Sequence, residues 1–429
     1  MKLNPQKQQN EGIPIQDNAA TTASITQAPI LLWERLNLPE YTLRAMENPR
    51  SPQTKAYQWL SNNINKSNNT QHLPVWRLMQ RFALATFYYS TRGDYWVSNQ
   101  GWLDWDTNEC NWEQLRWSDP QAGEVDCNDS GKLLSLQFVA ANNLDGTIPP
   151  EISLLHESLE VLLLSWNRQL KGSIPTEAGM MTRLTVLWFS ATHLSGALPT
   201  ELGQLQSLEN LMISHSELDG TLPTELGNLS NLTTLGFQMA NFSGSIPTEI
   251  LRLSNLQSLS FLECPLLEKT AFLPGVVGNL HNLKILNLSN RKTGDLTSIP
   301  SEIGKLTNLE NLIFTDFQFN GTIPSEMGSL TKLAYLTLKR NSISGTLPEE
   351  LSKVSQLRVL RIQSNKLEGR ILEKGVLHQL SKLLLLEISD NLFSGSLPTE
   401  VGLCLALELN CKTRKYLALF PRNCFCWTT

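Results

Sequence analysis

Apolar positions in the middle of this chain repeat every 24 residues. From Leu184 to Pro247, three successive segments share the pattern LxxLxLxxxxLxGxLP, with Ile or Phe at some of the leucine positions. The LxxLxL part alternates apolar and polar positions, which is typical of a short strand with one buried face. One such segment cannot bury its own leucines, so it must stack on its neighbours. The repeat therefore predicts a solenoid, with one coil per repeat.

The pattern predicts eleven coils, numbered here 1 to 11 by their first strand leucine. These leucines are Leu133, Leu159, Leu184, Leu208, Leu232, Leu256, Leu283, Leu309, Leu333, Leu357 and Leu383. Stacked strands are expected to form one parallel sheet. A glycine such as Gly196 suits a tight bend in each coil, and the proline that follows it suits an irregular return path.

The GxIP or GxLP signature, followed by ELG as in Glu201 to Gly203, resembles the plant-type leucine-rich-repeat class. The resemblance covers residues 133 to about 403. It implies an α/β solenoid, a superhelix of about eleven coils with a concave parallel sheet. Members of that class include receptor ectodomains and inhibitors of wall-degrading enzymes.

Three blocks before the repeats extend the resemblance. They are LPEYTLRAMENPRSPQTKAYQWL, RFALATFYYSTRGDYW and GWLDWDTNECNW, and their order is similar to that of the diatom leucine-rich-repeat receptor-like family. Members of that family commonly carry a membrane anchor upstream of these blocks, which implies an extracellular or cell-surface location. This chain shows no transmembrane segment, and Met1 to Asn18 lacks the apolar core of a signal peptide. A cytoplasmic location therefore stays open.

Composition divides the chain into four segments. Residues 1–50 are expected to be disordered or weakly ordered, because their first half is polar with hardly any aromatic residue. Residues 51–131 are expected to form a helical region, with helices over 54–63 and 74–91, and the N-terminal repeat cap. Residues 132–403 form the solenoid. Residues 404–429 form an irregular tail, either a cap stapled through Cys411, Cys424 and Cys426 or an altered end of a longer array.

The resemblance also assigns two of the seven cysteines. In the plant class, a cysteine pair around a tryptophan closes the cap before the first coil. Cys110 and Cys127 stand at that place, so the resemblance implies a disulfide between them, with a reduced pair as the alternative. Cys264 falls at an inward coil position and is expected to be a core residue.

The solvent-facing strand positions are the expected ligand-binding surface, because stacking joins them into one continuous patch. They are apolar and aromatic in the early coils and mostly charged in the later ones. Exposed apolar groups gathered on one face usually mark a contact site, and Trp and Arg are typical anchors. The candidates are Trp166, Trp188, Met212, His215, Met239, Asp316, Lys339, Arg340, Arg361 and Gln363. The alternative is that Trp166 packs under the cap helices and that the arginines form a solvated basic face.

Irregular coils are a second feature of the repeats. An asparagine at Asn341, Asn365 and Asn391 is expected to satisfy backbone groups inside the bend, and other residues replace it in several coils. The replacements are Thr192, Ser216, Ala240, Cys264, Arg291 and Phe317. Two insertions, 263–275 and 290–300, are expected to project from the same side.

Other chemistry has little support in the sequence. No catalytic or cofactor motif and no metal-ligand spacing occurs, and a net charge of −5 gives no electrostatic footprint for nucleic acid. A recurring glutamate after each proline, Glu151 in coil 1, is expected to lie in the first turn of a short helical segment and to point into water. Glycosylation candidates are Asn228, Asn231, Asn241, Asn287 and Asn320.

The sequence thus predicts a non-catalytic recognition protein without cofactor or metal. We expect it to bind a protein, peptide or glycan on the concave face, in receptor-like sensing or adhesion at the cell surface. The alternatives are an inhibitor of a secreted hydrolase and an intracellular interaction scaffold. Membrane association would require an anchor that is absent from this chain.

Overall fold

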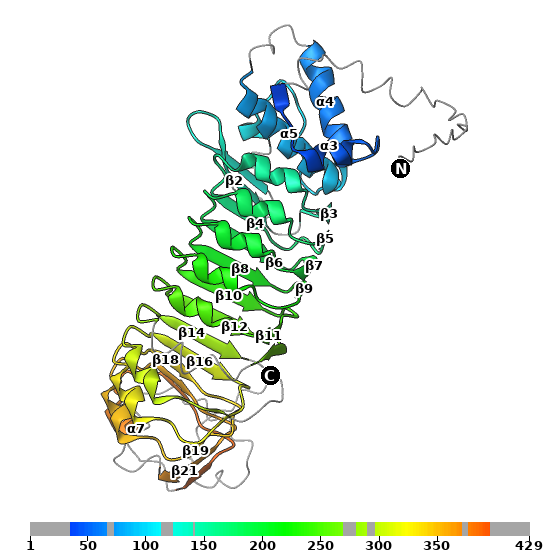
Figure 1. Ribbon diagram of the computed structural model, residues 1–429. Helices are drawn as coiled ribbons and strands as arrows, with labels where there is room; N and C mark the ends of the chain where they lie inside the picture. The colour runs from blue at the N-terminus through cyan, green and yellow to red at the C-terminus, as the bar shows by residue number, and fades with distance from the viewer. Residues whose placement is uncertain are drawn as a thin grey trace, which may run out of the picture.

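The computed structural model describes residues 35–66, 73–112, 123–139, 142–268, 280–289, 297–370 and 376–394. A helical region lies at the N-terminal end of an elongated solenoid (Figure 1). Among the described residues the α-helices are α3 (Glu40–Met46), α4 (Pro52–Lys66), α5 (Val75–Ser90) and α7 (Val376–Gln379).

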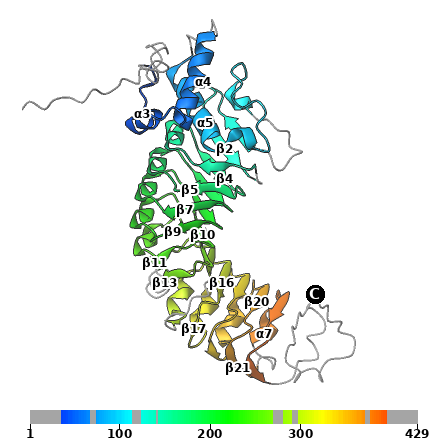
Figure 2. The same ribbon diagram turned by 90° about the vertical axis from the view of Figure 1, so that its right-hand side faces the viewer.

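The main sheet has twelve strands, in the order β1-β2-β4-β6-β8-β10-β12-β14-β16-β18-β20-β22. β1 is antiparallel to β2, and the other eleven are parallel, one for each coil, so the eleven coils are confirmed. The sheet lines the inner side of the curved solenoid (Figure 2). The strands are β1 (Gly123–Cys127), β2 (Leu133–Phe138), β4 (Val161–Leu164), β6 (Val186–Ser190), β8 (Asn210–Ser214), β10 (Thr234–Gln238), β12 (Ser258–Leu262), β14 (Ile285–Ser289), β16 (Asn311–Thr315), β18 (Tyr335–Thr337), β20 (Val359–Arg361) and β22 (Leu385–Glu387).

Each coil turns after its main strand and then adds a short second strand. These second strands form smaller parallel sheets beside the main one. They are β3 (Asp145–Thr147), β5 (Gln169–Gly172), β7 (His193–Ala197), β9 (Glu217–Asp219), β11 (Ser243–Ser245), β13 (Leu266–Glu268), β15 (Thr297–Ser298), β17 (Phe319–Asn320), β19 (Ser344–Gly345), β21 (Lys366–Arg370) and β23 (Leu392–Ser394).

The return path of most coils is a single 3₁₀ helix that begins after a proline, as at Pro199 and Pro223. Two further 3₁₀ turns lie in the cap, η2 (Gly93–Tyr95) and η3 (Glu109–Asn111). Those of the coils are η4 (Pro150–Leu155), η5 (Thr176–Met180), η6 (Thr200–Gln204), η7 (Thr224–Asn228), η8 (Thr248–Arg252), η9 (Ser301–Lys305), η10 (Ser325–Ser329) and η11 (Glu349–Lys353).

Close stacking of the coils explains the glycine of the ELG motif. A Cβ atom added at Gly203 would lie 2.5 Å from the carbonyl oxygen of Glu225 in the next coil, well inside van der Waals contact. The same clash recurs at Gly179 with Glu201 and at Gly227 with Glu249. In these three coils glycine is therefore required, because the neighbouring backbone occupies the space that a side chain would need.

The coil asparagine joins neighbouring coils. Asn341 accepts hydrogen bonds from the N–H groups of Phe317 and Phe319 through Oδ1, both at 3.1 Å, and donates through Nδ2 to the carbonyl of Phe314 at 2.9 Å. Asn167 in coil 2 makes an equivalent set of bonds, a position that the sequence analysis did not single out. Where the asparagine is replaced, at Thr192 and Ser216, the buried side-chain hydroxyl has no hydrogen-bond partner.

The helical region closes the first coil. Phe87 on α5 stacks on Phe138 of β2 with ring centroids 5.5 Å apart, and Trp96 meets the same ring at 4.9 Å. The N–H of Leu133, at the start of the first coil, donates to Oε1 of Gln80 on α5 at 2.7 Å. α5 therefore covers the end of the solenoid core, both by apolar contact and by satisfying a strand N–H.

Two expectations about this region are corrected. The segment 1–50 includes helix α3, whose Met46 is buried among α4 and α5, so its described part is packed against the cap instead of being weakly ordered. Glu151 does not point into water: it is fully buried and accepts hydrogen bonds from Thr42 at 2.8 Å and Gln53 at 3.0 Å. The α3 and α4 helices dock on this carboxylate.

The remaining expectations on unusual segments fall mostly on residues that the structure does not describe. These are most of the two insertions and the whole tail 404–429 with Cys411, Cys424 and Cys426. Across the described ranges, no helix has both the length and the apolar character that crossing a bilayer requires.

Candidate functional site

The strands of the main sheet present aligned outward positions to the inner face of the solenoid. The parallel register places Trp188 beside Met212, and Met212 beside Gly236. We call this line the middle row. From coil 2 to coil 11 it comprises Leu163, Trp188, Met212, Gly236, Ser260, Asn287, Ile313, Thr337, Arg361 and Glu387.

A second line of side chains lies just past the strand ends, and we call it the turn row. Its members have left-handed backbone, for example φ 61° at Trp166 and φ 54° at Arg340. The N–H of Trp166 donates to the carbonyl of Ser190 in the next coil at 2.7 Å, and that of Arg340 to Gln363 at 2.9 Å. The turn row comprises Trp166, Ala191, His215, Met239, Glu263, Asp316, Arg340, Ser364 and Asp390.

This geometry corrects the expected placement of six candidates. Strand positions were expected for Trp166, His215, Met239, Lys339, Arg340 and Gln363, but the strands end before them. Asp316, expected near the strand positions, lies on the turn row. The chain must bend there to enter the second part of the coil, and the left-handed conformation makes the bend. These side chains therefore stand along the edge of the inner face, beside the middle row.

The early coils expose large apolar side chains on both rows. The exposed fractions are 54% for Trp166, 43% for Trp188 and 41% for Met239. Met212 is half-buried because its thioether covers Gly236, where an added Cβ would lie 2.3 Å from the sulfur. We call these four residues, together with the half-buried Leu163, the apolar patch.

The cap helices do not cover Trp166, the first aromatic residue of the apolar patch. Trp166 was expected either to bind ligand or to pack under the cap helices, and an exposed fraction of 54% excludes the second option. His215, also exposed, is its polar neighbour on the turn row. On both rows, the described residues from Leu163 to Met239 include no Asp, Glu, Lys or Arg.

The later coils are different, because their charged side chains pair with one another. Arg340 Nη2 lies 2.7 Å from Asp316 Oδ2, and Arg361 Nε lies 3.3 Å from Glu387 Oε1. The Gln363 amide also donates to Glu387, whereas its own Oε1 is buried without a partner. Each of these two arginines therefore has an acidic partner in a neighbouring coil, while the Arg340 side chain stays 49% exposed and the Arg361 side chain 40% exposed. Lys339, half-buried, lies beside Arg340.

The sequons fall on several faces. Asn228, Asn231 and Asn241 are exposed, and Nδ2 of Asn231 donates to the Gln206 carbonyl at 2.9 Å. Asn320 is half-buried in β17. Asn287 is half-buried in the middle row, so a glycan there would occupy the same face as the expected ligand.

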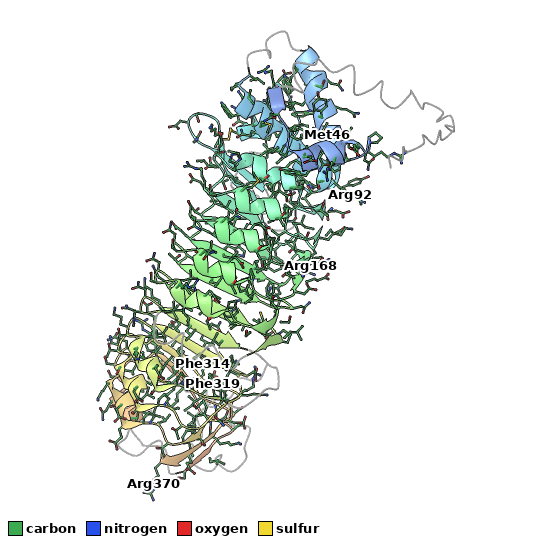
Figure 3. The ribbon with its side chains drawn as sticks, viewed as in Figure 1. Met46, Arg92, Arg168, Phe314, Phe319 and Arg370 are labelled. Atoms are coloured by element: carbon green, nitrogen blue, oxygen red, sulfur yellow. A yellow bond between two sulfur atoms is a disulfide. The ribbon has the colours of Figure 1, made fainter. Side chains whose placement is uncertain are left out.

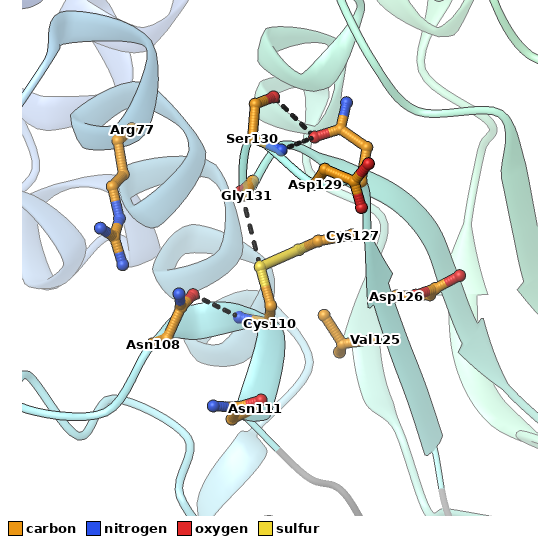
Figure 4. A pocket seen from close by; sticks show the side chains of 11 residues that line it. Arg77, Asn108, Cys110, Asn111, Val125, Asp126, Cys127, Asp129, Ser130 and Gly131 are labelled. Carbon is orange, nitrogen blue, oxygen red and sulfur yellow. Dashed lines mark hydrogen bonds between the residues drawn. A yellow bond between two sulfur atoms is a disulfide. The ribbon is translucent and has the colours of Figure 1, made fainter.

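The cap contains a polar cavity of about 370 Å³ beside the disulfide between Cys110 and Cys127 (Figure 4). Arg77 on its wall is bound to Glu109 at 3.0 Å, and Arg81 reaches the same carboxylate at 2.9 Å. Burial raises the pKa of Glu109, but hydrogen bonds and charges from Arg77 and Arg81 outweigh burial and leave it below the usual value. Arg77 and Arg81 of α5 thus bind Glu109 of η3 and hold the two elements together, so we assign these three residues a structural role.

Nothing in the described ranges resembles a metal centre, because no three His, Cys, Asp or Glu side chains converge there. Cys264 is a buried thiol whose pKa burial raises to about 11, as expected of a core residue. The candidate binding site is therefore the inner face of the solenoid together with the turn row.

Comparison with known proteins supports this architecture. A leucine-rich repeat region is matched over residues 251–405. Many solved structures share the fold, among them two plant receptors. The plant peptide hormone receptor RGFR1 in complex with RGF2 is 35% identical, with a TM-score of 0.57, over 63% of this chain and 43% of that chain. The Arabidopsis receptor kinase HAESA ectodomain, in complex with an N-terminally extended IDA peptide hormone, is 27% identical, with a TM-score of 0.59, over 66% and 47%.

A plant ice-binding protein, 24% identical with a TM-score of 0.57 over 75% of this chain and 96% of that chain, shows likeness of fold alone. No sequence among the curated proteins matches. The chain spans less than half the length of the two receptor ectodomains. With the coil geometry, these matches show a plant-type leucine-rich-repeat solenoid preceded by a helical region.

Proposed function

We propose that this plant-type leucine-rich-repeat chain is a non-catalytic recognition protein that binds a segment of a protein or peptide along its inner face. The observation that carries the proposal is the apolar patch. Trp166, Trp188 and Met239 are each more than two-fifths exposed on backbone that coil-to-coil hydrogen bonds hold in place. Large apolar groups gathered on a rigid surface gain free energy when a partner covers them.

The two halves of the inner face suit different parts of such a segment. The apolar patch offers aromatic and thioether surface to apolar side chains. The paired charges of the later coils, Arg340 with Asp316 and Arg361 with Glu387, offer polar contacts that set the register of the ligand. The structures of the peptide hormone receptor RGFR1 with RGF2 and of HAESA with an IDA peptide hormone support a peptide as the ligand class to test first.

The proposed role is receptor-like sensing or adhesion outside the cell. The disulfide between Cys110 and Cys127 supports it, because such bonds persist in oxidising compartments. Mass analysis of the protein from its native source should find this disulfide and glycans at exposed sequons such as Asn228. Reduced cysteines without glycans would instead favour the intracellular scaffold.

Inhibition of a secreted hydrolase is the alternative role, with the same inner face covering an enzyme. It predicts dose-dependent loss of hydrolase activity at stoichiometric protein. A receptor-like role predicts no such loss.

Binding is tested with a displayed library of random peptides selected on the purified protein. Selected peptides are measured against the wild type, Trp188→Ala and Met239→Ala, with Met180→Ala as matched control. Met180 is 49% exposed but lies on η5, in the return path of its coil. We expect affinity to fall about tenfold or more for the two patch variants, as at other anchor residues, and to stay unchanged for the control. Equal affinity of all four proteins would contradict the proposed site.

A further inference from the structure

Two exposed apolar residues of the cap were not found by the sequence analysis. Tyr95 is 71% exposed and Val97 is 58% exposed, among the largest exposed fractions of apolar side chains in the described residues. They stand on either side of Trp96, which is 5% exposed and packs on Phe138 of the first coil. The buried tryptophan thus anchors a short loop that holds its two neighbours outward.

Hydrogen bonds fix this loop on the first coil. The N–H of Val97 donates to the carbonyl of Asn142 at 3.0 Å, and the N–H of Ser98 donates to Asn142 Oδ1 at 2.8 Å. Nδ2 of Asn143 donates to the carbonyl of Tyr95 at 3.1 Å. The conformation is therefore set by contacts with the solenoid, as for the turns of the coils themselves.

The loop continues the line of the turn row. Asn142 is the asparagine at the bend of coil 1, equivalent to Asn167 that follows Trp166 in coil 2. The N–H of Val97 donates to the carbonyl of Asn142 in coil 1, and the N–H of Trp166 donates to the carbonyl of Ser190 at the end of β6 in coil 3, so each joins its turn to the next coil. Arg92, at the start of this loop, and Arg168, next to Asn167, lie on the same edge of the molecule (Figure 3). The cap loop thus occupies the place of a turn before coil 1.

The charges nearest the loop have partners of their own. Arg92 is paired with Asp145 at 2.7 Å, and Asp94 accepts a hydrogen bond from the Tyr88 hydroxyl at 2.9 Å. Arg168 and Glu217 lie further along their coils, at the entry to the second strands. Among the described residues, the line from Val97 through Trp166 to Met239 therefore consists of aromatic, aliphatic and uncharged polar side chains, and the exposed Arg168 and Glu217 lie beside it.

We propose that Tyr95 and Val97 form part of the ligand-binding surface and that, with the apolar patch, they bind an uncharged, apolar-rich stretch of an extended peptide. A neutral surface favours this partner, since a charged side chain placed on it would lose water without gaining a counter-charge. From the cap loop to coil 5 there are about five strand spacings of roughly 4.8 Å, or about 24 Å. An extended peptide covers that span with roughly seven residues. This inference rests on the proposed function, because it concerns the same site.

The test uses peptides selected on the wild type from the displayed random library. Each is measured against the double variant Tyr95→Ser with Val97→Ser, against Trp188→Ala, and against the control Val75→Ser. Val75 is 44% exposed at the first residue of α5, the helix end remote from the loop. We expect about a tenfold or larger loss of affinity for the double variant and for Trp188→Ala, no change for the control, and an uncharged apolar run in the selected peptides. Thermal unfolding of each variant verifies folding.

Each other outcome is decisive. Loss of binding in Trp188→Ala with full binding by the double variant would overturn the cap-loop inference and leave the proposed function standing. Full binding by both variants would remove the proposed function as well. Selected peptides with a charged consensus would contradict the stated partner chemistry. Failure to select any peptide, with binding of neutral oligosaccharides instead, would overturn the choice of a peptide partner.

Discussion

At the bend of each coil, the identity of one residue decides whether its side chain forms hydrogen bonds with the backbone of the neighbouring coil. Ser216 and Thr192 are two positions where these hydrogen bonds are missing. Each stands where Asn167 and Asn341 bind backbone groups of two coils, and each keeps a buried hydroxyl without a partner. A buried polar group without a hydrogen bond costs stability. The sequence identified the replaced positions, but it could not show which hydroxyls stay unbonded, because that depends on the distance to the next coil.

Replacing Ser216 by Asn should therefore stabilise the protein. His215 before it has φ 50°, close to the φ 54° of Arg340 before Asn341, so the backbone already suits an asparagine. We expect the free energy of unfolding to rise by about 1 kcal/mol, and to fall by about 1–3 kcal/mol for the reverse change, Asn341→Ser. Urea unfolding of both variants measures this. A destabilised Ser216→Asn would show that the bend cannot hold the amide.

Glu151 is a second residue whose effect depends on its surroundings. Burial raises its pKa above the usual 4.5; hydrogen bonds from Thr42 and Gln53 oppose the shift, and the charge of Glu177 adds to it. The folded state therefore holds the proton more tightly than the unfolded state. The contribution of this group to stability is present below pH 4.5 and is lost as pH rises through the raised pKa.

The variant Glu151→Gln tests whether Glu151 makes the wild type less stable as the pH rises. Glutamine has nearly the same shape and no charge, so the unfolding free energy of the variant, relative to the wild type, should be greater at pH 7 than at pH 4.5. Denaturant unfolding of both proteins at the two pH values gives the difference. A difference that is the same at both pH values would mean that Glu151 does not change its protonation between folded and unfolded states.

At the scale of elements, the strands were predictable and the turns after them were not. The LxxLxL spacing predicted eleven strands, since period-two alternation and burial of leucine directly determine that structure. The turn row was misplaced because strict alternation does not describe it. Trp166, His215 and Met239 each come two residues after a buried strand residue, and the left-handed backbone at each of them turns the side chain outward. Tyr95 and Val97 were missed because no repeat marks them, and only their bonds to coil 1 place them beside the patch.

The cap is held together by a disulfide and by the ion pairs of Glu109 with Arg77 and Arg81. Replacing both Cys110 and Cys127 by Ser removes the bond between η3 and β1, and the unfolding free energy should fall by up to about 3 kcal/mol in the chain-entropy picture. The loss should appear as lowered hydrogen-exchange protection in β1 and η3, with the strands from β8 onward little changed. Uniform loss of protection along all coils would show instead that cap and coils unfold as one unit.

At the scale of the whole molecule, the repeat makes a scaffold whose inner face divides into an uncharged half and an ion-paired half. Fold class and coil number followed from the sequence, because they depend on periodicity. The sequence also predicted that the early coils present apolar and aromatic side chains and that the later coils present mostly charged ones. The pairing of Arg340 and Arg361 with acidic neighbours was not, because it depends on which side chains meet across coils.

Hydroxyl-radical footprinting of the protein with and without a selected peptide tests the central claim most directly. Trp166, Trp188 and Met239 are exposed and oxidisable, and Met180 on η5 serves as an internal reference. The account predicts that bound peptide lowers oxidation of Trp166, Trp188, Met239 and Tyr95 and leaves Met180 unchanged. Protection of Met180, with unaltered oxidation of the two tryptophans, would contradict recognition through the inner face.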